Sequence, residues 1–329
     1  MNKLTFFLIL GIAFLFQACS QKQYFEPEQT QSHYMDIYDL GSKIVDINSD
    51  GATLKDNTFV SKDGPSSKTL QEGFRFLNEN ENIILSTNDE GVLLINDNGK
   101  IEKIKFDKNI ISASIEKDLI AFGSIDNSIS LYDRKTKKTL FKEYQKQSLL
   151  NDIKITNPMF LNSLILFPTL DGKVVIVDKA KKTVYKTINI DPSSEINNII
   201  YLKAIGNTLV AATPKKVFSF VDGRVNTIEH NVKAVAVGDG NVFVATLEGE
   251  IIKYNEKLNR LKSKKFRFAK FYTMAYSKYL YALESQGYLI KLDNSLTNAE
   301  VLDFSFDEEE KVITIDNKIY FDDSYIVLQ

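Results

Sequence analysis

The segment NVFVATLEGEIIKYN, residues 241–255, decides the fold. Residues 242–246 are rich in β-branched and aromatic side chains, and residues 251–254 form a second run of the same kind. Between the two runs stands Glu248-Gly249, and glycine readily adopts the positive φ that a tight turn needs. The segment therefore predicts one β-hairpin.

The same pattern recurs along the chain, with a mean step of about 39 residues between successive turns. The other copies cover residues 83–95, 119–132, 164–177, 209–220, 279–292 and 319–328. A weaker eighth copy is expected at residues 57–64, with Asp63-Gly64 as its turn. A repeat of roughly 40 residues that contains only strand patterns has the size of a four-stranded propeller blade. The sequence predicts an all-β fold, a single β-propeller with eight blades, or seven as the alternative.

The ends of the chain indicate how this ring closes. The last hairpin copy leaves no room for a fourth strand before Gln329, whereas residues 33–47 are strand-like. An open ring would leave bare strand edges, so we expect an N-terminal strand to complete the last blade. Stacked repeats share one continuous core, and the propeller is therefore expected as a single domain over residues 36–329.

The N-terminus has the pattern of an export signal. Lys3 precedes an apolar run over residues 4–16, which is too short to span a bilayer of ~30 Å hydrocarbon thickness. Phe16-Gln17-Ala18-Cys19 resembles the lipobox of bacterial lipoproteins, with Phe16 in place of the usual Leu. The resemblance implies cleavage after residue 18, lipidation of Cys19 with fatty acyl chains such as palmitate, and a flexible tether over residues 19–35. Ser20, where an Asp would imply inner-membrane retention, favours the outer membrane.

Composition excludes several classes of partner and cross-link. The formal net charge of −2 provides no basic field to hold nucleic acid, so no nucleic-acid partner is expected. Cys19 is the only cysteine of the 329 residues, which leaves no second sulfur for a disulfide within one copy.

One repeat resembles a known family in its details. Residues 128–141 resemble the quinoprotein-type propeller repeat, with Asp133, Thr136 and Lys138 at matching positions. Lys137 stands at the glycine of that repeat and Phe141 at its tryptophan. Together with the lipobox, the chain resembles the BamB family of outer-membrane assembly lipoproteins. That family has an eight-bladed ring and no catalytic activity, and it binds components of the β-barrel assembly machinery and unfolded outer-membrane proteins.

Catalytic chemistry has little support in the sequence, and the chain is not expected to be an enzyme. The two histidines, His33 and His230, stand in no metal or triad spacing and are interpreted as solvated loop residues. A redox quinoprotein would stack its cofactor on tryptophan, and the chain has none. No cofactor is expected, and no catalytic residue is assigned.

One calcium-like motif remains at residues 46–51. Asp46, Asn48 and Asp50 offer oxygen ligands at alternate positions, and Gly51 follows them. Leu54 and Asn57 stand where a complete calcium loop needs further ligands, including a bidentate glutamate. The alternative interpretation is an Asx-rich hairpin turn with Asp50-Gly51 at its tip.

Two charged stretches have a functional and a structural interpretation. The first could face an anionic lipid or partner, although its Phe-Arg-Phe alternation is typical of a half-buried outer blade strand. It comprises Lys262, Lys264, Lys265, Phe266, Arg267, Phe268, Lys270, Phe271 and Tyr272. The second, residues 307–310, is a run of four acids that predicts a solvated loop.

The leading expectation is a non-catalytic scaffold, anchored by lipid at the periplasmic face of the outer membrane, that binds other envelope proteins. A suspected partner is the barrel-assembly subunit, and extended peptides could add to blade edges.

Two alternatives stay open. The first is a lipoprotein that binds a small molecule or glycan in the propeller channel, or a lyase-like enzyme that uses this channel. The second is an adhesin-like lipoprotein exposed at the cell surface.

Overall fold

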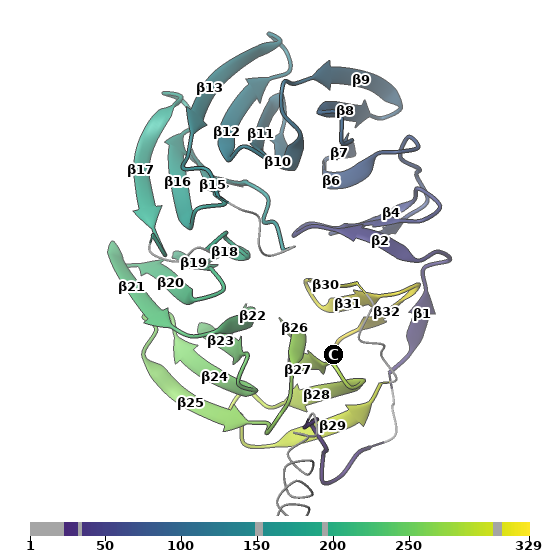
Figure 1. Cartoon of the computed structure of the whole chain (residues 1–329), viewed down its shortest axis with the longest axis vertical. Helices are drawn as coiled ribbons and strands as arrows, with labels where there is room; N and C mark the ends of the chain where they lie inside the picture. The colour runs from purple at the N-terminus through teal and green to yellow at the C-terminus, as the bar shows by residue number, and fades with distance from the viewer. Residues whose placement is uncertain (1–22, 32–34, 149–153, 193–196, 305–310) are drawn as a thin grey trace, which may run out of the picture.

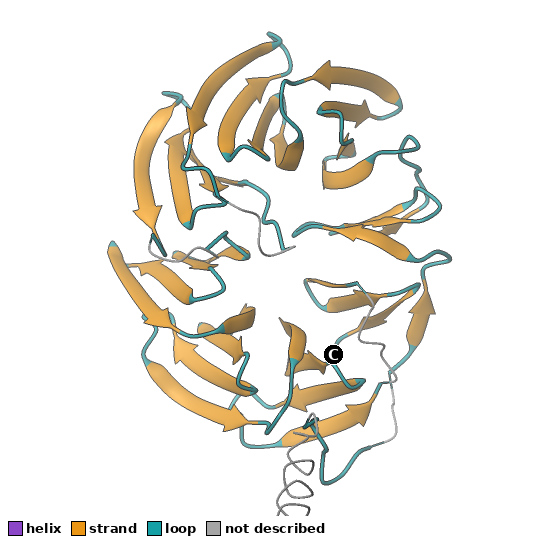
Figure 2. Ribbon diagram, viewed as in Figure 1, coloured by secondary structure: helices purple, strands orange, loops and turns teal. Residues whose placement is uncertain are grey.

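The computed structural model describes residues 23–31, 35–148, 154–192, 197–304 and 311–329. These residues form eight antiparallel sheets of four strands each, arranged as blades in a ring (Figure 1). Turns and loops connect the strands (Figure 2). The fold is therefore an eight-bladed β-propeller, which confirms the predicted class and the higher of the two blade numbers.

The strands are, from blade one to blade eight: β2 (Ile44–Ile47), β3 (Ala52–Leu54), β4 (Phe59–Ser61), β5 (Gly64–Ser66); β6 (Arg75–Asn80), β7 (Ile83–Thr87), β8 (Val92–Asp97), β9 (Lys100–Lys105); β10 (Ile110–Glu116), β11 (Leu119–Ser124), β12 (Ser128–Asp133), β13 (Lys138–Tyr144); β14 (Met159–Leu161), β15 (Leu164–Pro168), β16 (Lys173–Asp178), β17 (Thr183–Asn189); β18 (Tyr201–Ile205), β19 (Thr208–Ala212), β20 (Lys216–Val221), β21 (Arg224–Glu229); β22 (Val232–Gly238), β23 (Asn241–Thr246), β24 (Glu250–Asn255), β25 (Arg260–Lys265); β26 (Phe271–Tyr276), β27 (Leu280–Glu284), β28 (Tyr288–Leu292), β29 (Ala299–Asp303); β30 (Val312–Ile315), β31 (Lys318–Phe321), β32 (Ser324–Val327) and β1 (Ile37–Asp39).

The hairpin at residues 241–255 supplies the second and third strands of blade six, β23 and β24. Their register runs from Asn241 opposite Asn255 to Ala245 opposite Ile251. Gly249 has a φ of +78°, and a Cβ there would lie 2.5 Å from the Phe266 carbonyl oxygen. The turn therefore needs glycine both for its backbone conformation and for close packing.

The middle strands of each blade carry the core because neighbouring blades cover them on both faces. In blade three, β11 and β12 are almost entirely buried, whereas the outermost strand β13 alternates between exposed and half-buried residues. Phe243 of β23 is fully buried and stacks on Tyr276 of the next blade, with ring centroids 5.3 Å apart. Burying one such side chain contributes roughly 1.5–3 kcal/mol, so contacts between blades stabilise the ring.

The residues that resemble the quinoprotein repeat build the turn between the third and fourth strands. Asp133 Oδ2 accepts a hydrogen bond of 2.8 Å from Thr136 Oγ1, and Asp133 Oδ1 accepts one of 2.9 Å from the Lys135 N–H. These bonds, led by the one from Thr136, lower the pKa of Asp133. Lys137 has a φ of +55°, the conformation that favours glycine at this position of the repeat.

The N-terminal strand closes the ring as predicted. β1 pairs antiparallel with β32 and is the outermost strand of blade eight, and the Leu40 N–H adds a 2.7 Å hydrogen bond to the Asp323 carbonyl oxygen. The rings of Tyr38 and Tyr325 stack across this seam, 5.1 Å apart. The first and last parts of the chain therefore share one sheet.

Two predictions about the N-terminal part were wrong in detail. Asp63-Gly64 joins the third and fourth strands of blade one, and the turn equivalent to the other copies lies at Asp56-Asn57. Part of the expected flexible tether is packed, because Phe25 is buried among residues of blades six and seven. Gln31 also exchanges two backbone hydrogen bonds with β29, its N–H donating to Val301 O at 2.9 Å and its C=O accepting from the Asp303 N–H at 3.3 Å. A single buried aromatic in a polar stretch gives no periodic signal, which is why the sequence did not reveal this docking.

Within the described ranges, no helix has the length and apolar character that a membrane crossing requires.

Ring closure gives a first prediction. Tyr38→Pro removes a backbone N–H from β1 and should disrupt its pairing with β32, since proline cannot donate to a strand ladder. We expect a lower Tm and faster amide hydrogen exchange in blades eight and one than in blades three to five. Tyr38→Phe serves as the control. Unchanged exchange in blade eight of the proline variant would contradict closure by β1.

Candidate functional site

A cavity lies in the central channel, along the innermost strands of the blades. Its volume is about 560 Å³. Amides, hydroxyls, aliphatic side chains and charged residues line it, with Phe160 and Tyr201 as its aromatic residues. The charged residues are Asp50, Lys62, Glu79, Lys154, Lys203, Lys233 and Asp316. Burial raises the pKa of the Tyr201 phenol far above its ordinary value, so this hydroxyl stays protonated. The channel is a mixed polar and apolar site.

A segment of the chain itself crosses this channel. Residues 154–158, the described end of the connection from β13 to β14, lie towards the middle of the ring (Figure 2) and line the cavity. Lys154 Nζ donates to the carbonyl oxygens of Lys233, at 3.1 Å, and Tyr272, at 3.2 Å. The amine therefore fastens the segment to blades six and seven.

Asn157 fastens the same segment to the other side of the ring. Its Nδ2 donates to Leu77 O at 2.7 Å, its Oδ1 accepts from the Ala113 N–H at 3.1 Å, and its own N–H donates to Ser49 Oγ at 2.9 Å. One side chain and its amide thus join blades one, two and three. The hairpin pattern did not predict this segment. The one available signal is the step of 45 residues between the turns at Asn127 and Gly172, which is longer than the mean step of about 39 and indicates an insertion.

The calcium-like motif lies on the wall of this cavity. Asp46 and Asn48 belong to the hairpin between β2 and β3, and Asn48 and Asp50 line the cavity. Asn48 Oδ1 accepts the Asp50 N–H at 2.8 Å, which is an Asx turn. Asp50 Oδ2 accepts a 2.7 Å hydrogen bond from Asn78 Nδ2. The described residues contain no group of three acidic, histidine or cysteine side chains placed to hold a metal ion.

Gly51 serves this hairpin through close packing. Its φ lies outside the left-handed region, but a Cβ would lie 2.1 Å from Val60 O and 2.3 Å from the Phe76 ring. The hairpin interpretation was therefore right about the turn. The glycine is needed for close packing against Val60 of the same blade and Phe76 of the next, and not for a positive φ.

Burial dominates the electrostatics of the hairpin. It raises the pKa of the Asp50 carboxyl above its ordinary value of 3.8, although hydrogen bonds from Asn157, Asn78 and Ser49 act in the opposite direction. Burial also raises the pKa of Asp46, partly offset by the charges of Arg75 and Lys311. The two carboxyls therefore favour their protonated forms more than an exposed aspartate does.

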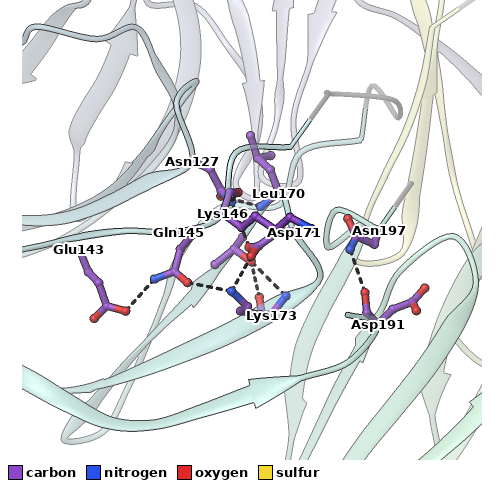
Figure 3. A network of polar contacts seen from close by, with 10 residues as sticks. Asn127, Glu143, Gln145, Lys146, Leu170, Asp171, Lys173, Asp191 and Asn197 are labelled. Atoms are coloured by element: carbon purple, nitrogen blue, oxygen red, sulfur yellow. Dashed lines mark hydrogen bonds and ion pairs between the residues drawn. The ribbon is translucent and has the colours of Figure 1, made fainter. Parts of the chain in front are cut away.

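A polar network joins blades three and four near their turns between second and third strands (Figure 3). Asn127 Nδ2 donates to Asp171 Oδ1 at 3.0 Å, and Asn127 Oδ1 accepts the Leu170 N–H at 2.8 Å. Lys173 pairs with Asp171 at 2.5 Å. Burial acts to raise the pKa of Asp171, but hydrogen bonds from Lys173, Thr169 and Asn127 hold it below its ordinary value. The network connects two predicted hairpin turns and stabilises the contact between blades.

Neither histidine extends this site in the described structure. His33 and the acidic run at residues 307–310 lie outside the described residues, as does Cys19. His230 is half-buried, and its Nε2 lies 2.6 Å from the Tyr254 hydroxyl, so it is not the fully solvated residue that was expected. Burial lowers its pKa, which favours the neutral imidazole.

The basic and aromatic stretch differs from its predicted strand. Lys262, Lys264 and Lys265 belong to β25, as expected for a solvated outer strand, but the residues after Lys265 form the connection to blade seven. Phe266 is buried there, whereas Phe268 is exposed and has a φ of +65°. The Phe266-Arg267-Phe268 alternation, which was predicted to be part of a strand, therefore lies in a turn. This turn buries the ring of Phe266 and exposes that of Phe268.

Packing at Gly51 generates a second prediction. Gly51→Ala should lower the free energy of unfolding by roughly 1–3 kcal/mol, because the added methyl overlaps Val60 O and the Phe76 ring. Gly240→Ala is the control, since its φ is +67° but no atom lies within 4 Å of the added methyl. Chemical denaturation measures both. Gly51 has no positive φ, so an unchanged free energy of unfolding in Gly51→Ala would contradict the packing role.

The raised pKa of Asp50 generates a third prediction. The folded state binds the proton of Asp50 more tightly than the unfolded state does. Protonated Asp50 therefore contributes to the free energy of unfolding at low pH. This contribution is lost as the pH rises through the pKa of the folded state. Asp50→Asn cannot ionise. The stability of the variant relative to the original chain should therefore increase as pH rises above 3.8. Urea denaturation across pH measures the difference, and a pH-independent difference would contradict the assignment.

Comparisons with known proteins add the following similarities. No family model matches the chain. The chain is 28% identical to plasminogen-binding protein PgbB of Helicobacter pylori strain J99 and 27% identical to that of strain 26695, in each case over 97% of this chain and 70% of the relative. Among solved structures, BamB from Moraxella catarrhalis has a TM-score of 0.67 at 13% identity and is matched over 91% of this chain and 99% of that one. The computationally designed Ika8 protein has a TM-score of 0.63 at 14% identity, and matches 91% of this chain and 98% of its own. At such identities the structures share the propeller fold with this chain.

Proposed function

We propose that the chain is a non-catalytic scaffold that binds other proteins of the cell envelope along the outer edges of its blades. The observation that carries this proposal is the pairing of Gln31 with β29. Here an extended segment adds to a free blade edge through main-chain hydrogen bonds, which is the mode by which many domains bind peptides. A main-chain mode tolerates varied client sequences.

Exposed apolar side chains on the outermost strands support the same mode. Tyr144 on β13 and Tyr185 on β17 are 67% and 69% exposed. Ile101 on β9 and Val225 on β21 are about half exposed. Aromatic and aliphatic groups beside an open strand edge offer pockets for the alternate side chains of an added peptide.

The proposed location is the periplasmic face of the outer membrane, with acyl chains on Cys19. The lipobox-like residues before Cys19 and the serine after it support this location. Two or more acyl chains, at ~0.8 kcal/mol per buried CH₂, hold a protein stably on a membrane. The proposed partners are the subunits of the β-barrel assembly machinery and unfolded outer-membrane proteins, and the resemblance to the BamB family supports them.

Photo-crosslinking from the blade edges tests the scaffold role. A photoreactive phenylalanine analogue at Tyr144 or Tyr185 should crosslink to barrel-assembly subunits or unfolded outer-membrane proteins in intact cells. The same analogue at the fully buried Tyr281 is the negative control. Recovery of no envelope protein from either edge position would count against the scaffold role.

The anchor has a separate test. Cys19→Ala should prevent acylation and cleavage, so the variant should keep the mass of its signal segment and lose its fatty acyl label. Metabolic labelling with a palmitate analogue and mass spectrometry measure both changes. A Cys19→Ala variant with the mature mass and an unchanged label would refute lipidation at this position.

A second candidate function is binding of plasminogen. The similarity over 97% of the chain to two proteins named for that activity favours it. It requires exposure at the cell surface, as in the adhesin-like alternative. Intact cells should then capture plasminogen and lose this ability after mild protease treatment. Capture only by lysed cells would favour the periplasmic location.

A small molecule or glycan in the channel is a further alternative, which the cavity of about 560 Å³ favours. Carbohydrate sites commonly stack sugars on aromatic faces, and this lining offers only Phe160 and Tyr201 among its described residues. Glycan-array binding that disappears in a Tyr201→Ala variant would support this alternative over the scaffold.

A further inference from the structure

A row of cations lies along the outer strand of blade six and the connection that follows it. We name this row, together with the exposed ring of Phe268, the basic rim; its cations are Lys262, Lys264, Lys265, Arg267 and Lys270. None of the five forms a salt bridge with the described residues. Lys262 and Lys264 instead donate to Thr297 Oγ1 at 2.6 Å and Thr297 O at 2.8 Å, and Lys265 donates to the Glu248 carbonyl oxygen. These three contacts are to uncharged oxygen atoms and form no ion pair.

Apolar groups accompany these charges. Phe268 is 37% exposed, and the Arg267 guanidinium lies over its ring, 4.6 Å from the centroid. Leu261, in the same outer strand, is 53% exposed. Cations beside exposed aromatic and aliphatic groups are typical of surfaces that rest at the boundary between lipid headgroups and acyl chains.

The docked N-terminal segment brings the chain's proposed anchor to this rim. The Phe25 ring packs edge-on against Phe266, with centroids 6.0 Å apart, and against Tyr288 at 5.7 Å. Phe266 is the residue that directly follows β25. Because Phe25 lies six positions after Cys19, an acylated Cys19 would lie within roughly 20 Å of Phe25, at about 3.3–3.6 Å per residue.

No acidic side chain among the described residues forms a salt bridge with the cations of the rim. Glu250 pairs with Arg260, which lies outside the basic rim. Glu26, Glu28 and Glu248 are exposed and form no salt bridge with the five cations among the described residues. Asp293 and Asp303 likewise form no salt bridge with the five cations, and Lys22 is a further positive charge in the sequence between the proposed anchor and Phe25.

We infer that the basic rim rests on an anionic lipid surface, so that the propeller is held with blades six and seven towards the membrane. The inference depends on the proposed anchor at Cys19. Acyl chains on Cys19 hold the rim near the lipid headgroups, and lysine and arginine are attracted to negative lipids once they lie within a Debye length of ~8 Å. β25 and β29 then face the membrane, and β13, on the opposite side of the ring, faces away from it (Figure 1).

The absence of tryptophan allows a direct test of this orientation. Phe268→Trp and Tyr144→Trp each create a single tryptophan, on the basic rim and on the far outer strand β13. The full lipidated protein is incorporated into vesicles of equal parts phosphatidylcholine and phosphatidylglycerol that carry a spin-labelled quencher lipid. We expect quenching and a blue shift of emission for Phe268→Trp, and no quenching for Tyr144→Trp.

Charge is tested by matched triple variants on the Phe268→Trp background. Lys262→Gln, Lys264→Gln and Lys265→Gln together should abolish most of the quenching, whereas Lys137→Gln, Lys138→Gln and Lys142→Gln on blade three should leave it unchanged. High salt should act as the first triple variant does.

Three outcomes would overturn the inference. Co-sedimentation with vesicles but no quenching of Phe268→Trp would refute the orientation while leaving the anchor intact. Equal quenching of both tryptophans would also refute the orientation alone. Full-length protein purified from cells that carries no acyl group on Cys19 and does not sediment with vesicles would refute the anchor and the orientation together.

Discussion

The pairing of β1 with β32 is the constraint on which the rest of the structure depends. It brings residues 37–39 beside residues 324–327 and so converts a row of blades into a ring. Only in a closed ring does each blade have two neighbours, and only then are both faces of strands such as β11 and β12 covered. Buried contacts such as Phe243 on Tyr276, repeated at the boundaries between blades, then supply stability that no isolated four-stranded sheet has.

Much of this architecture could be predicted because its local signals repeat. Turn residues such as Gly249 and alternating apolar runs recur at a regular interval, and the size of that interval identifies a blade. Blade one was placed less well, because its strands are only three or four residues long and its turn at Asp56-Asn57 lacks glycine. The turn at Asp63-Gly64 carried the stronger local signal and therefore set the wrong register.

The candidate site could not be predicted to the same degree because it depends on contacts between residues far apart in sequence. Asn157 bonds to Ser49 and Leu77, and no spacing pattern relates these positions. The docking of Phe25 against Phe266 is a similar case. The Asx-rich hairpin was identified correctly as a turn, but its position on the channel wall and the raised pKa of Asp50 follow from the closed ring. Three-dimensional neighbours, and not local motifs, determine the environment of these residues.

The channel, the outer blade edges and the N-terminal segment together favour binding at the edges of the propeller. The channel is crossed by a segment of the chain, the outer edges carry exposed aromatic residues, and one edge already holds an extended segment at Gln31. We propose the outer edges as the binding surface. Amide hydrogen exchange of the lipidated protein, alone and with its co-purified partner, tests this claim most directly. Partner binding should slow amide hydrogen exchange in outermost strands such as β13 and β17. Slower exchange only in the strands that line the channel would contradict a binding surface at the outer edges.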